Sequence, residues 1–141
     1  MKRYLTGPRA GSLLWRFRKF HTGIQKMKKR LYQAAFWIAL AAIMFLAVTP
    51  QGIRLAKGTS DKVNHAIAFF ILSFLGDRAF EKPFMAIALS LVGFGMMIEL
   101  VQFTLPYRSF SLYDMLANIF GIVLFAVIKY VTGRNRQRLS R

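Results

Sequence analysis

The stretch MIELVQFTLPYRSFSLYDMLANIFG, residues 97–121, is mostly apolar but contains Glu99, Gln102, Arg108, Asp114 and Asn118. Its proline, residue 106, cannot continue a helix and disfavours helical backbone in the residue before it. The stretch therefore predicts the end of one apolar helix, a short turn and the start of another. The whole chain has only five acidic residues. Two of them lie in these apolar runs. A charge there is energetically unfavourable unless it is paired, and it commonly marks a functional site.

The composition of the chain indicates a membrane protein. Of the 141 residues, 55% are hydrophobic, and the net charge is +16. Ten of the 21 basic residues lie in the first 31 positions and four in the last nine. A soluble nucleic-acid-binding domain would carry its basic residues on a folded surface, whereas here they flank long apolar runs. We therefore expect the lipid bilayer, and not nucleic acid, as the partner. The absence of cysteine excludes disulfides and thiolate metal sites.

Four apolar segments predict an all-α, polytopic membrane protein built as a bundle of four transmembrane helices. The segments are residues 34–48, 60–80, 84–105 and 112–131. In the last of them, Ala117 and Gly121 form a pair of small residues one turn apart, which permits close helix packing. We expect three regions: a basic segment at 1–31, a membrane domain at 32–131 and a basic tail at 132–141.

The segment 12–31 predicts an amphipathic helix before the bundle. Its apolar residues are three or four positions apart, which places them in one stripe on a helix whose remaining surface is strongly basic. Such a helix is suited to the surface of an anionic lipid leaflet. Docking on the protein itself is the alternative.

The distribution of Lys and Arg predicts that both termini are cytoplasmic. Four spans place both basic tails on one side, together with the connection between the second and third spans. The opposite, outer side then receives the polar residues of three spans, which we expect to line one outward-facing pocket. They are Asp61, Lys62 and His65 at the start of the second span, Glu99 and Gln102 near the end of the third, and Arg108, Ser111, Asp114 and Asn118 at the start of the fourth.

These residues resemble the VanZ-like family. The segments DKVNH (61–65), ELVQ (99–102) and YRSFSLYDMLANIFG (107–121) occur in the family's order. The resemblance covers about residues 50–130 and leaves the basic segment before Leu31 outside. It implies a small multi-helix protein of the bacterial inner membrane. The family takes its name from a member associated with low-level teicoplanin resistance, so the resemblance implies a role in glycopeptide resistance at the cell envelope.

Two functional hypotheses follow. In the first, the pocket binds or acts on a cell-envelope component or a glycopeptide. In the second, the protein is an enzyme acting on a phosphate-containing, lipid-linked envelope precursor. Acid–base or nucleophilic groups would be His65, Glu99 and Asp114. Binding residues would be Asp61, Lys62, Gln102, Arg108, Ser111 and Asn118. No known catalytic signature assigns a reaction, so whether the protein is an enzyme is left open.

A structural role is the remaining alternative for these residues, since polar pairs between helices could simply hold the bundle together. One histidine and two carboxylates, widely separated in the sequence, are a weak signal for a metal ion. We therefore predict no metal site and no cofactor.

Overall fold

The computed structural model describes residues 9–49, 61–107 and 110–139, except for the side chains of residues 9–19, 61 and 134–139. Within these residues all regular secondary structure is α-helical. The helices are α1 (Arg9–Val48), α2 (Asp61–Ala79), α3 (Phe84–Phe103) and α4 (Leu112–Leu139). Three stretches are long and apolar enough to cross a membrane: Phe20–Val48, Phe84–Phe103 and Leu112–Gly133.

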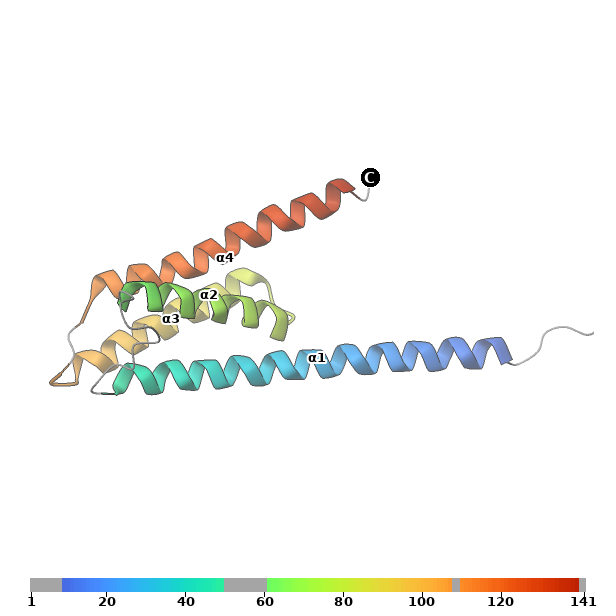
Figure 1. Ribbon diagram of the computed structural model, residues 1–141, viewed down its shortest axis with the longest axis horizontal. Coiled ribbons are helices and arrows are strands. Elements are labelled where there is room, and N and C mark those ends of the chain that lie inside the picture. The colour runs from blue at the N-terminus through green and yellow to red at the C-terminus, as the bar shows by residue number, and fades with distance from the viewer. Residues whose placement is uncertain (1–8, 50–60, 108–109, 140–141) are drawn as a thin grey trace, which may run out of the picture.

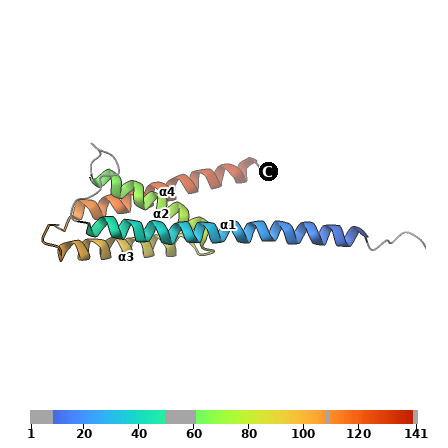
Figure 2. The ribbon, with the colours of Figure 1, turned by 60° about the horizontal axis from the view of Figure 1, so that its bottom comes forward.

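The helix α2 is not among these three stretches. It has Lys62 near its start and Asp77 and Arg78 near its end, so charged residues limit its apolar length. Yet α2 contacts each of the other three helices, whereas α1 and α4 make no contact with each other in the described residues. Figures 1 and 2 show this central position. The other helices cover much of its surface.

One continuous helix, α1, replaces the two separate helices that we expected in this part of the chain. Its 40 residues include both the basic amphipathic segment and the first apolar span. The expected boundary near Leu31 is not a break, because the sequence has no proline between Pro8 and Pro50 to stop the helix. At ~1.5 Å per residue α1 is about 60 Å long. Its N-terminal part extends well past the turn between α2 and α3 (Figure 1).

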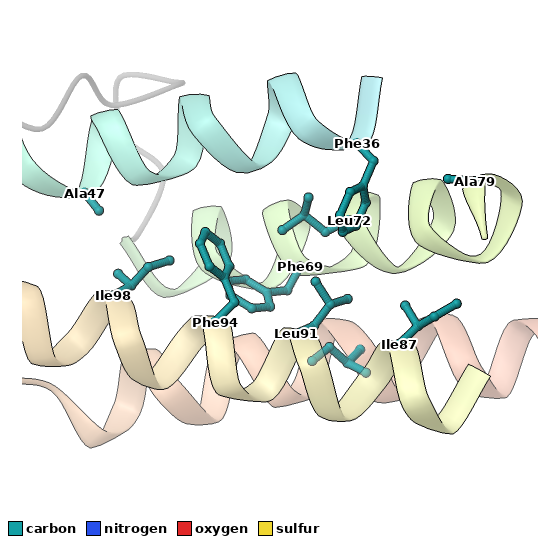
Figure 3. Packing of buried hydrophobic residues seen from close by; sticks show 10 residues of the cluster. Phe36, Ala47, Phe69, Leu72, Ala79, Ile87, Leu91, Phe94 and Ile98 are labelled. Atoms are coloured by element: carbon teal, nitrogen blue, oxygen red, sulfur yellow. The ribbon is translucent and has the colours of Figure 1, made fainter. Parts of the chain in front are cut away.

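The apolar core lies between α1, α2 and α3, and Ile122 of α4 packs into it. Phe69 and Leu72 of α2 are fully buried, and they pack with Leu91, Phe94 and other core residues. Figure 3 shows these side chains filling the space between the helices. Burying large aromatic and aliphatic side chains against close-packed neighbours fixes how the helices are rotated relative to one another.

Glycine at position 121 lets α4 approach the backbone of α2 closely. A Cβ atom there would lie 2.2 Å from the carbonyl oxygen of Ala66 and 3.0 Å from the amide nitrogen of Phe70. Both are backbone atoms, so a larger residue would force the helices apart. The close packing that we predicted for Gly121 is therefore present.

The bundle has two chemically different ends. At the loop end, α1 and α3 finish at Val48 and Phe103, and α2 and α4 begin. At the turn end, residues 80–83 connect α2 to α3. There Lys29 forms an ion pair with Glu81 at 2.8 Å, and Lys129 pairs with Asp77. Both lysines lie on helices that continue past this turn (Figures 1 and 2).

Candidate functional site

Three acid–base side chains from three helices meet at the loop end. They are His65 of α2, Glu99 of α3 and Asp114 of α4, and one potential ligand atom of each lies within 4.8 Å of the others. Glu99 is fully buried, and the other two are partly buried. We refer to these three residues as the triad.

The triad forms because each member lies close to a helix terminus at the same end of the bundle. His65 lies in the second turn of α2, Asp114 in the first turn of α4, and Glu99 one turn before the end of α3. Since α3 runs antiparallel to α2 and α4, its last turn lies beside their first turns (Figure 2). The site is therefore at one end of the helix bundle and not at its middle.

Asn118 orients the histidine. Its side-chain oxygen Oδ1 lies 2.9 Å from Nδ1 of His65. A carbonyl oxygen can only accept, so Nδ1 donates in this contact, and when the ring is neutral Nε2 has the lone pair. Asn118 is almost fully buried, and within the described residues its amide nitrogen Nδ2 has no hydrogen-bond partner.

A small residue on α3 makes room for Asn118. A Cβ atom at Gly95 would lie 3.0 Å from Nδ2 of Asn118 and 3.2 Å from the ring of Phe69. Gly95 is one helical turn from Glu99. The glycine therefore lets a buried amide lie directly beneath the triad.

Ser111 connects the triad to the start of α4. Its backbone N–H donates to Oε2 of Glu99 at 3.0 Å, and its hydroxyl oxygen accepts from the backbone N–H of Asp114 at 3.3 Å. The second contact is that of an N-cap residue. Glu99 reaches the cap from another helix, so its carboxylate lies where the positive end of the α4 dipole favours negative charge.

Lys62 lies at the rim of the site. Its Nζ is 4.0 Å from Oδ1 of Asp114 and 5.5 Å from the ring centre of Tyr113, and about half of its side chain is exposed. At 4.0 Å the pair is an ionic contact without a hydrogen bond. Lys62 can therefore turn towards a ligand while Asp114 stays in place.

Gln102, which we predicted to bind substrate, contacts the end of α1. Its Nε2 donates to the carbonyl oxygen of Ala47 at 3.1 Å. The hydroxyl of Tyr107 donates to the carbonyl of Val48 at 2.8 Å. Both bonds satisfy carbonyl groups in the last turn of α1, which have no partner within the helix. No local signal in the sequence assigns this role to Tyr107, although Pro50 indicates a helix end that would leave such carbonyl groups without a partner.

Two predicted site residues cannot be placed. Arg108 lies outside the described residues, and so does the side chain of Asp61. The structure thus brings together His65, Glu99, Asp114, Asn118, Ser111 and Lys62, and it places Gln102 at the contact with α1.

The apolar helices and the polar cluster between them define a small, all-helical membrane protein. The model of the VanZ/LLP1 family matches residues 12–132, and the chain belongs to this family. The match also includes most of the basic N-terminal segment, which we had expected to lie outside the resemblance. No curated protein and no solved structure matches the chain.

Proposed function

We propose that the triad and its neighbours bind the polar part of a cell-envelope component, either a lipid-linked precursor or a glycopeptide. The observation that carries this proposal is the convergence of a histidine and two carboxylates at the loop end. Ionisable residues within apolar helices are unfavourable, and they commonly mark binding or reaction sites. In this setting the carboxylates would accept hydrogen bonds from hydroxyl or amino groups.

The donor groups of the site suit a ligand that also carries acceptors. Lys62 at the rim and the buried amide of Asn118 can donate to phosphate, carbonyl or sugar oxygen atoms. Arg108 is a further predicted donor. Lipid-linked envelope precursors and glycopeptides both combine such acceptors with hydroxyl and amino groups. A part in low-level glycopeptide resistance agrees with the family resemblance.

A catalytic role is the second candidate, and the orientation of His65 favours it. With Nδ1 donating to Asn118, Nε2 can accept a proton and act as a general base. The carboxylates of Glu99 and Asp114 lie close enough to share in proton transfer. A phosphate-containing, lipid-linked precursor would be the substrate.

Pure scaffolding explains the cluster less well. Hydrogen bonds between membrane helices contribute about 0.6 kcal/mol each and at most about 1.7 kcal/mol. The fully buried Glu99 lies close to a second carboxylate, Asp114. Two carboxylates this close together oppose helix association when both are ionised. The contacts of Gln102 and Tyr107 with α1 already hold the loop end together without any charge.

For the site to receive an envelope component, the loop end has to face outwards. We propose that all four helices cross the bacterial inner membrane and that both termini are cytoplasmic. The chain has no cysteine, so single cysteines can report this orientation. In intact spheroplasts, a membrane-impermeant maleimide should label Thr104→Cys at the loop end and not Lys82→Cys at the turn end. The reverse result would place the site on the cytoplasmic side.

We also propose that the basic half of α1 binds anionic lipids of the inner leaflet. Phe20, Met27 and Leu31 are exposed on a segment rich in Lys and Arg. A peptide of residues 12–31 should gain helicity on anionic vesicles and lose it when salt is added. An equal response to neutral vesicles would favour docking on a protein surface instead.

Substitutions in the triad test the proposed function. Glu99→Gln and Asp114→Asn remove a charge and retain side-chain size, so the proteins should accumulate normally in membranes. They should lose at least about tenfold in ligand affinity or in the protection that the protein confers against glycopeptides, since a hydrogen bond to a charged group contributes about 1.5–3 kcal/mol. Asp77→Asn at the turn end is the matched control and should behave like the wild type.

Membrane abundance and melting temperature must be measured on the same variants. Loss of the phenotype in proportion to loss of folded protein would support a scaffold. A normal phenotype in both triad variants would contradict the proposed site.

A further inference from the structure

We infer that His65, Glu99 and Asp114 form a binding site for one divalent transition-metal ion, and that Zn²⁺ is the best fit. The three residues offer one imidazole nitrogen and two carboxylate oxygens. Zn²⁺ accepts this mixture, and its open sites combine three protein ligands with a fourth position for water or a ligand. Mg²⁺ and Ca²⁺ prefer oxygen atoms alone.

The distances between the donor atoms suit a shared ion. Zinc lies about 2.0–2.2 Å from nitrogen and oxygen ligands, so donor atoms at tetrahedral angles around one ion are about 3.4 Å apart. The donor atoms of the triad lie within 4.8 Å of one another. Closing the site around an ion would therefore draw the donor atoms together by up to about 1.4 Å (4.8 − 3.4), a distance that side-chain rotation can cover.

Asn118 supplies the orientation that a metal-binding histidine normally has. Such a histidine usually donates the N–H of one ring nitrogen to an oxygen acceptor, which leaves the other nitrogen to bind the metal. Nδ1 of His65 and Oδ1 of Asn118 make this contact at 2.9 Å. Asn118 is held in a buried position against Gly95, so the ring orientation is set by the helix packing.

A divalent cation between the carboxylates would lower the repulsion between them. Glu99 and Asp114 repel each other when both are ionised, and the apolar surroundings screen this repulsion poorly. Lys62 approaches Asp114 only from the rim, at 4.0 Å and partly exposed to solvent. A divalent ion among the three donors would neutralise both carboxylates directly.

The spacing of these three residues in the sequence does not reveal that they form one set of metal ligands. His65 and Glu99 are 34 positions apart (99 − 65), and Glu99 and Asp114 are 15 apart (114 − 99). No short metal-binding motif contains them, which is why we predicted no metal site. Their proximity depends on the antiparallel arrangement of α2, α3 and α4. Metal binding here also does not require an envelope component to bind, so it can be tested separately from the proposed function.

The first experiment measures zinc binding to the full-length protein, purified in detergent with a tag that lacks histidine and stripped of metal by a chelator. Calorimetric titration should give one Zn²⁺ per chain. His65→Ala, Glu99→Gln and Asp114→Asn should each weaken binding at least about tenfold, and Asn118→Ala should weaken it about 10–100-fold as an outer-shell partner. Asp77→Asn should bind like the wild type.

Helicity and monodispersity have to be checked for each variant, so that lost binding is not confused with lost structure. Absence of Zn²⁺ binding by the folded wild-type protein would overturn the inference. Equal binding by the triad variants and Asp77→Asn would overturn it as well, because the ion would then lie elsewhere.

A second experiment does not depend on loss of binding. Because the chain lacks cysteine, His65→Cys would provide the protein's single thiolate. Cobalt added to this variant should produce a near-ultraviolet thiolate-to-metal absorption band. The matched control is Ser90→Cys on the exposed face of α3, which should produce none. A band in both variants, or in neither, would contradict the inference.

Discussion

The two ends of the helix bundle use the same types of charged residue in opposite ways. At the turn end, Glu81 pairs with Lys29 at the surface, and Asp77 pairs with Lys129. At the loop end, Glu99 is fully buried beside Asp114 and His65. Exposed ion pairs contribute only about 0–1 kcal/mol. Burial of a charge is unfavourable by more than that unless partners compensate for it.

This difference separates structural charges from candidate functional ones. At the turn end, the two ion pairs add to the packing of Phe36 on Phe80 and to the hydrogen bond that Gln33 donates to the carbonyl oxygen of Ala79. At the loop end, by contrast, Glu99 and Asn118 are polar side chains buried between the helices. We therefore expect substitutions at the loop end to affect function or metal binding strongly, and substitutions at the turn end to affect either only slightly.

The largest effect on stability should come from Gly121→Ala, which tests the helix contact beneath the loop-end site. The added Cβ would meet the Ala66 carbonyl oxygen at 2.2 Å, and backbone cannot move aside as a flexible side chain can. Overpacking of this kind destabilises by about 1–3 kcal/mol or more. Thermal unfolding in detergent, followed by circular dichroism, measures this loss.

The matched control is Gly93→Ala on α3, where a Cβ would have no atom within 4 Å. Its stability should stay the same or rise by up to about 1 kcal/mol, because alanine favours helix more than glycine does. If the two variants had the same melting temperature, that result would contradict the close contact between α2 and α4.

An intermediate effect is expected for Asn118→Ala, which removes the buried partner of His65. The change leaves the Nδ1–H group of the histidine without its acceptor and creates a small cavity. A buried polar group that loses its partner destabilises by about 1–3 kcal/mol. Melting temperature reports the change. Ser90→Ala, which removes an exposed hydroxyl bonded to Ala86 within the same helix, should stay within about 0.5 kcal/mol of the wild type.

The smallest effect concerns the pH dependence of the turn end. The hydrogen bond and the positive charge of Lys29 hold the pKa of the Glu81 carboxyl below its usual range. Because the pKa is lowered in the folded state, the contribution of this pair is present above the unfolded pKa. It is lost as the pH falls through the folded value. The effect is slight, since Glu81 is largely exposed.

Melting temperatures of the wild type and Glu81→Gln, measured as a function of pH, test the direction of this pH dependence. The wild type should be marginally more stable at neutral pH, and the difference should disappear under acidic conditions. Lys29→Met should show the same convergence with the wild type. A difference that grew as the pH fell would contradict the assignment.

The sequence by itself determined the all-helical class, the apolar segments, the basic tails and the family resemblance. These depend on local properties: hydrophobic runs, charge distribution, and prolines that end helices. Gly121 at a helix contact could also be predicted, and the cap of α4 could be narrowed to Ser109 or Ser111, because cap and small-residue signals are short. The conclusion that Glu99 and Asp114 share one end of the bundle followed from their positions near helix termini.

Only the tertiary structure decided which side chains face one another. It assigned Gln102 to the end of α1, paired Asn118 with His65, and joined the basic segment to the first span in one helix. These facts depend on how each helix is rotated about its axis, which is set by non-local packing such as Gly121 against Ala66. A rotation by one residue is about 100° in an α-helix with 3.6 residues per turn. Such a change would separate the triad while leaving every local sequence signal unaltered.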